Sequence, residues 1–159
     1  YRFINPKLIE HKGDLSKLDD VRLQFVRALD GLLSRAPTYQ GTVFRRLQIN
    51  GMPDAETFLN AHQPGALVRY SNYTSTSRDK RMLSGDADIV LTIRSRSGVD
   101  ISRLSQFEEQ EAEVLLPRRA IYRVVEHTMA GGRHRITLEE VSEIAHNESK
   151  VMQLSLLSE

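Results

Sequence analysis

The chain has 159 residues, and its 22 Lys and Arg against 21 Asp and Glu give a formal net charge of +1. This balance argues against a dedicated DNA- or RNA-binding domain, which usually carries a basic excess on one face. The absence of cysteine excludes disulfides, thiolate catalysis and cysteine-based zinc sites. The length predicts one domain over residues 1–159. Because the sequence has neither an initiator Met nor a signal-peptide core, we expect a fragment or the C-terminal part of a longer protein.

Two helices are predicted in the first part of the chain. The first covers residues 18–35, where acidic residues open the helix and Pro37 ends it. The second is short, starting at Pro53 and running to residue 62, with Phe58 and Leu59 inward. Three- and four-residue spacing predicts that one apolar face of the first helix points inward. That face comprises Leu18, Val21, Phe25, Ala28, Leu29 and Leu32.

Short β-rich segments dominate the remainder of the chain. They are residues 41–49, 66–73, 88–95, 113–117, 120–127 and 134–141. Only two residues separate 113–117 from 120–127, which predicts a hairpin. Residues 148–159 fit either an edge strand or a helix, and no apolar run reaches the ~18 residues of a membrane-spanning helix. Helices first and strands afterwards predict a mixed α+β fold with a largely antiparallel sheet.

Three separated segments carry polar residues that a strand pattern does not require. Arg45 lies inside a β-rich run, and the stretch YTSTS, residues 73–77, is predicted to close the next strand. The stretch FEEQEAEVLLP then places Glu111 and Glu113 directly before an apolar strand. Each segment alone has an ordinary structural interpretation. Arg45 would be a solvent-side residue, the hydroxyl cluster would form hydrogen bonds at a strand end, and the acidic stretch would be a solvated loop.

In this order and spacing, the three segments resemble the arginine–serine–glutamate class of mono-ADP-ribosyltransferases, a family of bacterial toxins and effectors and of vertebrate ecto-enzymes. The resemblance runs from about residue 18 to residue 141. It implies the ADP-ribosyltransferase fold, with two mainly antiparallel sheets, flanking helices and an NAD cleft between the sheets. It also implies transfer of ADP-ribose from NAD+, a co-substrate, to an arginine of a target protein. Nicotinamide is released and no metal is involved.

The resemblance implies a role for each residue that matches the family's motifs. Arg45 is implied to hold the NAD phosphates, and Ser75 to position the catalytic glutamate, Glu113. Thr76 and Ser77 are implied to shape the nicotinamide pocket and bind NAD+ with Arg45, Ser75 and Glu113.

Position 46 departs from the family pattern. Arg46 stands where the family often has a small residue, frequently glycine. If Arg45 were not the residue that contacts NAD+, Arg46 would be its replacement.

The two glutamates suit two different steps of the implied chemistry. Cleaving the nicotinamide–ribose bond develops positive charge on the ribose, which a carboxylate at Glu113 would stabilise. A guanidinium with a pKa above ~12 is a poor nucleophile, so a second carboxylate, Glu111, must take its proton. In an extended backbone, residues two apart point to the same side. We therefore expect Glu111 and Glu113 to face the cleft while Ala112 faces away.

The residues before the two glutamates are expected to recognise the protein substrate. These substrate-recognition residues are Phe107, Glu109, Gln110 and Glu111. Phe107 either packs against the partner or staples the loop. Some relatives use Gln-x-Glu and modify asparagine, but the Val-Leu-Leu run fixes Glu113 as the catalytic acid. The position two before it is therefore Glu111, which favours arginine as the acceptor.

Three other functions remain open for the sequence. They are an NAD glycohydrolase that uses water, a transferase that acts on a nucleic acid, and a catalytically inactive binding module of the same fold. The dinucleotide fold is excluded because no Gly-x-Gly-x-x-Gly follows a strand. The histidines have no metal-ligand spacing, and each is predicted to be a surface or boundary residue; they are His11, His62, His127, His134 and His146.

The absence of cysteine also bears on the origin of the chain. The vertebrate ecto-enzymes carry disulfides, so a bacterial toxin or effector is the better match. We expect it to be secreted or injected and to act in the cytoplasm of a target cell. Its expected partners are NAD+, a target protein modified on arginine, and a cognate immunity or chaperone protein. Neither a membrane nor a nucleic acid is an expected partner.

Overall fold

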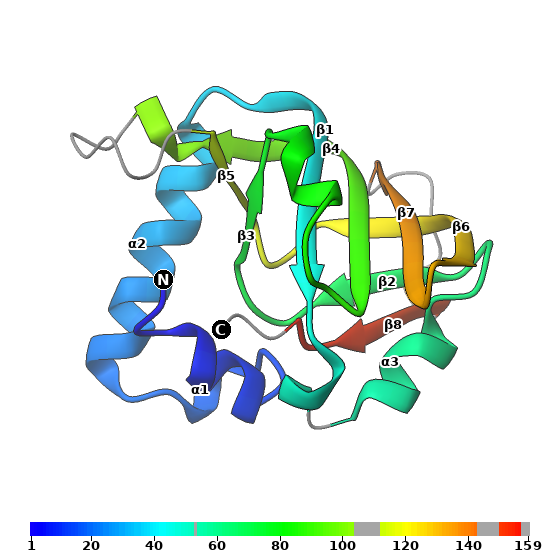
Figure 1. The fold of residues 1–159 in the computed structure, drawn as a ribbon. Helices are drawn as coiled ribbons and strands as arrows, with labels where there is room; N and C mark the ends of the chain where they lie inside the picture. Colours follow the sequence, from blue (N-terminus) through cyan, green and yellow to red (C-terminus); the bar gives the residue numbers. More distant parts are fainter. Residues whose placement is uncertain (53, 104–111, 143–149, 157–159) are drawn as a thin grey trace.

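The computed structural model describes residues 1–52, 54–103, 112–142 and 150–156. The α-helices in this part of the chain are α1 (Asn5–Glu10), α2 (Asp20–Arg35) and α3 (Ala55–Ala61). The strands are β1 (Tyr39–Leu47), β2 (Leu67–Tyr70), β3 (Thr74–Ser77), β4 (Ile89–Asp100), β5 (Glu113–Leu116), β6 (Ile121–Ala130), β7 (Arg133–Val141) and β8 (Val151–Leu154). Helices α1 and α2 lie on one side of the strands, and α3 lies on the other (Figure 1).

The strands form a hydrogen-bonded network in the order β1-β3-β5-β4-β7-β6-β2-β8, with β1 also paired to β4. Neighbours are antiparallel except for the parallel pairs β4–β7 and β2–β8. The short pair β3–β5 is joined to the larger part by one residue pair between β1 and β3 and two between β4 and β5. The predicted α+β class with a mainly antiparallel sheet is confirmed.

Residues 66–77 form two strands that lie in different parts of the network. Strand β2 pairs with β6 and β8, whereas β3 pairs with β1 and β5. The chain leaves the first part at Asn72, whose buried side chain accepts the N–H of Leu156 and donates to its carbonyl. The Ser-Thr-Ser motif therefore does not extend the preceding strand but begins the short β3–β5 pair.

The hairpin predicted between residues 113–117 and 120–127 is wrong. Strand β5 pairs with β3 and β4, while β6 pairs with β2 and β7. Between them, the guanidinium of Arg118 donates from Nε and Nη2 to the carboxylate of Asp30 on α2. This partly buried pair ties the connection between β5 and β6 to the helix. The close hairpin is instead β6–β7, whose turn has positive φ at Gly131 and Gly132.

The other predicted elements differ mainly at their ends. Helix α2 begins one residue after Asp19, whose carboxylate accepts the N–H of Arg22. Helix α3 begins at Ala55, with Asp54 as its cap; Pro53, its predicted start, lies outside the described residues. The C-terminal segment, which fitted two structures, forms the edge strand β8 beside β2.

The predicted inward face of α2 is wrong for four of its six residues. Leu18 and Leu29 are partly buried and pack against the interior, but Val21, Phe25, Ala28 and Leu32 are exposed. The fully buried residues of the helix are instead Val26 and Leu33. Asp30 lies on the same side of the helix as Val26 and Leu33, since the spacing is four and three residues. This side binds Arg118 and Tyr73 through the carboxylate. The inward face thus contains a charged residue, which a search for the most apolar stripe leaves out.

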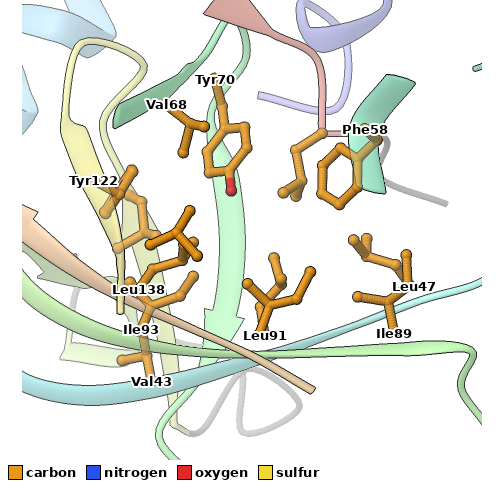
Figure 2. Close-up of a cluster of buried hydrophobic side chains, with 14 of the residues drawn as sticks. Val43, Leu47, Phe58, Val68, Tyr70, Ile89, Leu91, Ile93, Tyr122 and Leu138 are labelled. Carbon is orange, nitrogen blue, oxygen red and sulfur yellow. The ribbon is translucent and has the colours of Figure 1, made fainter. Parts of the chain in front are cut away.

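Two apolar clusters fill the interior. The larger one lies between the main part of the sheet and α3, with Phe58 of α3 directed toward Tyr70 and Val68 (Figure 2). Leu91 and Ile93 of β4 also point into it, as their alternation predicts. The second cluster joins α1 and α2 to the β3–β5 pair and consists of Ile4, Leu8, Val26, Leu33, Tyr73, Val99 and Leu115.

Candidate active site

Ser75 and Glu113 meet on the β3–β5 pair. Ser77 lies opposite Glu113, and Ser75 lies opposite Leu115. Residues two apart on a strand share a face, so Ser75 and Glu113 are diagonal neighbours on one side of the pair. Ser75 Oγ donates a hydrogen bond of 2.7 Å to Glu113 Oε2. The structure therefore brings together the serine and the glutamate that the sequence assigns to one site.

Arg45 reaches the same strand from β1. Its Nη1 donates to the carbonyl oxygen of Ser75 at 3.3 Å, and the residue is partly buried. The strand pairing that brings it there is that of Phe44 with Ser77. Arg45 is thus linked through the backbone of Ser75 to the serine that binds Glu113.

Arg46 faces the opposite side of β1, because successive side chains of a strand alternate. Its guanidinium lies against Gly85, where a Cβ atom would come within 2.0 Å of Arg46 Nη1. Gly85 therefore leaves the space that this side chain occupies. Of the two arginines, Arg45 is the one that lies beside Ser75.

Thr76 and Ser77 differ in their orientation. Thr76 is buried on the face away from Ser75, and its hydroxyl donates to the carbonyl of Val114 at 2.6 Å. It therefore secures β3 to β5 rather than sharing the face of Glu113. Ser77 lies on that face, and its Oγ accepts the N–H of Asp79 at 3.0 Å, which fixes the turn after β3.

The residue before Glu113 is not extended. Ala112 has φ of +71°, in the left-handed region, and its carbonyl accepts the N–H of Arg78 at 2.8 Å. The alternation used to place Glu111 beside Glu113 therefore does not apply through Ala112. Glu111 itself lies outside the described residues, as do Phe107, Glu109 and Gln110.

Tyr1 also reaches the carboxylate, which the sequence reasoning missed. Its hydroxyl donates to Glu113 Oε2 at 2.5 Å, across 112 positions of sequence. Burial, and then the hydrogen bond to Glu113, raise the pKa of the Tyr1 side chain above its ordinary value. No periodicity or motif marks this tyrosine, because the contact depends on how α1 docks onto β3.

The two bonds leave one oxygen of the carboxylate available. Both Ser75 and Tyr1 donate to Oε2, and within the described residues no hydrogen bond reaches Oε1. A carboxylate held on one oxygen presents the other in a defined direction. Glu113 can thus accept a hydrogen bond from a ligand hydroxyl, or stabilise a positive charge that develops beside it.

Neither a metal site nor a membrane span is found in the described part of the chain. Residues 1–52, 54–103, 112–142 and 150–156 contain no group of three or more His, Asp or Glu side chains that could hold a metal ion. Over the same ranges, no helix is long and apolar enough to cross a membrane.

Comparison with known proteins identifies the family. The sequence profile described as "ART: NAD:arginine ADP-ribosyltransferase" matches residues 19–146. The chain belongs to this family. The match spans Arg45, Ser75 and Glu113, so the predicted family membership is confirmed.

One curated relative is the NAD(+)--protein-arginine ADP-ribosyltransferase Tre1 of Serratia proteamaculans. It is 26% identical over 141 residues, which cover 89% of this chain and 29% of Tre1. The chain thus spans less than a third of the length of that relative.

Solved structures of ADP-ribosyltransferases share the fold. The C3 exoenzyme of Clostridium limosum matches with a TM-score of 0.71 and 20% identity, over 88% of this chain and 78% of the exoenzyme. The Vis toxin of Vibrio splendidus matches with a TM-score of 0.64 and 19% identity, over 93% and 74% of the two chains. The predicted ADP-ribosyltransferase fold is confirmed.

Proposed function

We propose that this chain is the catalytic domain of a mono-ADP-ribosyltransferase that moves ADP-ribose from NAD+ to an arginine side chain of a target protein. The observation that carries the proposal is the carboxylate of Glu113, bound by Ser75 at 2.7 Å in a chain of this family. Arg45, which contacts the backbone of Ser75, supplies the cation nearby. That this domain is part of a longer protein stays a prediction.

The proposed reaction begins at the bond between nicotinamide and the ribose. As the C1′–N bond breaks, nicotinamide leaves with the electron pair and positive charge develops on the ribose. Glu113 stabilises this charge while its Oε1 accepts a hydrogen bond from a ribose hydroxyl. Arg45 binds the pyrophosphate, for which a planar guanidinium is better suited than an ammonium group.

The second half of the reaction concerns the acceptor. A nitrogen of the target arginine forms the new bond to C1′, and its proton passes to Glu111. Phe107, Glu109 and Gln110 belong to the segment that recognises the target. These roles rest on sequence position and family membership, since the four residues lie outside the described part of the chain.

The first test removes the charge of Glu113. In Glu113→Gln, both ADP-ribosylation and NAD hydrolysis should fall on the order of 10²–10³-fold, because both pass through the ribose cation. Nicotinamide release is measured from labelled NAD+ with agmatine as acceptor, a ligand present in a structure of Vis. Glu126→Gln removes an equal charge from an exposed position of β6 and should keep both rates. Wild-type rates in Glu113→Gln would mean that Glu113 is not the catalytic acid.

The second test separates the two glutamates. Glu111→Gln should lose transfer to agmatine while slow hydrolysis of NAD+ continues, because Glu111 acts only on the proton of the acceptor. Equal loss of both activities would contradict this division of labour. Free ADP-ribose as the sole product of the wild-type protein would instead support a hydrolase, label on nucleic acid would support the nucleic-acid transferase, and no turnover at all would support a binding module.

We also propose that the chain acts as a secreted or injected bacterial effector in the cytoplasm of a target cell. Its support is the relative in Serratia and the shared fold of toxin structures. Expression of the wild-type chain in a bacterial cytoplasm should slow growth, and Glu113→Gln should restore it. Co-expression of neighbouring open reading frames then tests for an immunity protein, which would restore growth with the wild-type chain. Undisturbed growth with an active enzyme would show that this bacterium does not contain the target.

A further inference from the structure

Tyr1 and Ser75 approach the same atom of Glu113 from different elements. The Tyr1 hydroxyl lies 2.5 Å from Oε2, and Ser75 Oγ lies 2.7 Å from it. A carboxylate oxygen can accept both bonds, and hydrogen bonds to a charged acceptor are roughly twice as strong as neutral ones. The family assignment accounts for the serine; it leaves the tyrosine without a role.

The backbone of Tyr1 is fixed by α1. Its carbonyl accepts the N–H groups of Ile4 at 3.0 Å and Asn5 at 2.9 Å, at the start of the helix. The residue is half-buried and packs against the cluster that contains Ile4, Leu8 and Leu115. The side chain therefore projects from a short, anchored segment toward β5.

Helix α1 is in turn fixed to β3. The buried amide of Asn5 donates to the carbonyl of Tyr73 at 2.9 Å and accepts its N–H at 3.0 Å. These two bonds replace those of a neighbouring strand at the residue immediately before β3. The hydroxyl of Tyr73 also reaches Asp30 on α2 at 2.5 Å. Because β3 carries Ser75, both donors to Glu113 are held relative to one another.

We infer that Tyr1 is a positioning residue, which acts with Ser75 to hold Glu113 Oε2 so that Oε1 faces the ribose of NAD+. This inference rests on the function proposed above. The tyrosine contributes through its hydroxyl, since a ring that only lined the pocket would be replaced without loss by phenylalanine. Ser75 alone leaves the carboxylate free to rotate about a single bond; two donors from two directions remove that freedom.

The test is Tyr1→Phe, with Tyr122→Phe as the matched control. The hydroxyl of Tyr122 is buried in the main core and makes no hydrogen bond within the described residues. Tyr1→Phe should lower kcat for nicotinamide release about tenfold, as expected for a lost bond to a charged group, with KM for NAD+ changed less than twofold. Tyr122→Phe should keep both constants, and both variants should melt within a few degrees of the wild type.

A second measurement shows whether Tyr1 acts through Glu113. In the Glu113→Gln background, adding Tyr1→Phe should reduce the residual rate less than twofold, because the charged acceptor of the hydroxyl is already gone. A tenfold further loss there would overturn the inference, since Tyr1 would then act on NAD+ by another route. A wild-type kcat in Tyr1→Phe would also overturn the inference. A higher kcat would do the same, because the hydroxyl would then slow the reaction.

The proposed function and this inference fail in different ways. If the wild-type protein does not cleave NAD+ with agmatine or with a cell lysate, the proposed function fails. If the wild type is active and depends on Glu113, but Tyr1→Phe has the kinetics of Tyr122→Phe, only the inference fails.

Discussion

At the scale of single residues, the site separates two adjacent arginines that the sequence alone does not distinguish. Arg45 contacts Ser75, whereas Arg46 lies against Gly85 on the other face of β1. One strand position thus decides which guanidinium lies beside Ser75. Variants of Arg45 and Arg46 can be compared directly, because both residues lie on β1, carry the same charge and are partly buried. They differ in the face of the strand from which the side chain projects.

Arg45→Lys and Arg46→Lys should therefore differ. The first keeps the charge but loses the planar fork, so kcat/KM for NAD+ should fall about tenfold or more. The second should leave kcat/KM unchanged, because its side chain does not enter the site. Steady-state kinetics with varied NAD+ make the comparison. The opposite pattern would show that Arg46 is the residue that binds the phosphates.

At the scale of elements, α2 shows how a charged residue can be part of an inward face. Asp30 binds both Arg118 and the hydroxyl of Tyr73, and it lies in line with the buried residues Val26 and Leu33. On the outer side, Phe25 packs edge-on against Phe3 at 5.7 Å. The helix is therefore held by the ion pair with Arg118, the hydrogen bond from Tyr73 and a narrow apolar stripe.

Two adjacent leucines test this orientation. Leu33→Ala should reduce the free energy of unfolding by about 2–5 kcal/mol, because Leu33 is buried and its loss leaves a cavity. Leu32→Ala should change it by no more than about 0.5 kcal/mol, because Leu32 is 45% exposed. Urea unfolding of both variants gives the two values. A larger loss at Leu32 would restore the inward face predicted from the sequence.

The elements were predictable where local signals decide them. Capping residues and Pro37 bound α2 to within two residues, and alternation placed Leu91 and Ile93 in the core. Strand pairing was not predictable in the same way. The hairpin after β5 failed because a contact with Asp30, 88 positions away, redirects the chain at Arg118.

In the candidate site too, residues in local motifs were predictable and residues placed by long-range contacts were not. Arg45, Ser75 and Glu113 were found because short motifs carry them, and the structure brings them together. Tyr1 was missed because its contact spans 112 positions of sequence and has no local pattern. The position of Thr76 on the opposite face follows from strand alternation, which the family resemblance had not taken into account.

At the scale of the whole molecule, hydrogen bonds of the buried residue His62 join α3 to the sheet. His62 is fully buried, so its prediction as a surface or boundary residue is wrong. Its Nδ1–H donates to the carbonyl of Phe58 at 2.6 Å, and its Nε2 accepts the hydroxyl of Tyr70 at 2.8 Å. The backbone carbonyl of His62 accepts from Nδ1 of His127 at 2.7 Å. Of these bonds, the one that Nε2 accepts from Tyr70 needs His62 to be neutral, because a protonated ring has no lone pair on Nε2.

Stability should therefore fall in mild acid. Burial lowers the pKa of His62 from 6.5 to about 4, so the unfolded chain takes up this proton at a higher pH than the folded one. The contribution is complete above pH 6.5 and is lost as the pH falls from 6.5 to about 4, by about 3 kcal/mol in total. Urea unfolding at several pH values measures this slope.

His62→Gln is the control for this slope. It should be less stable at pH 7 but show a flatter dependence between pH 6.5 and 4, because glutamine does not titrate. An equally steep slope in the variant would assign the effect to other groups, such as His134, whose pKa is lowered mainly by burial.

The left-handed backbone of Ala112 sets the mutational tolerance of the position before Glu113. At φ of +71°, glycine and asparagine fit with the least strain, and β-branched side chains fit worst. This order is the reverse of the usual one beside a β-strand. A library that varies residues 107–111, the segment proposed to recognise the acceptor, should therefore end at residue 111. If position 112 were also varied, the library would select residues that tolerate a positive φ. That selection would conceal any change in the choice of target.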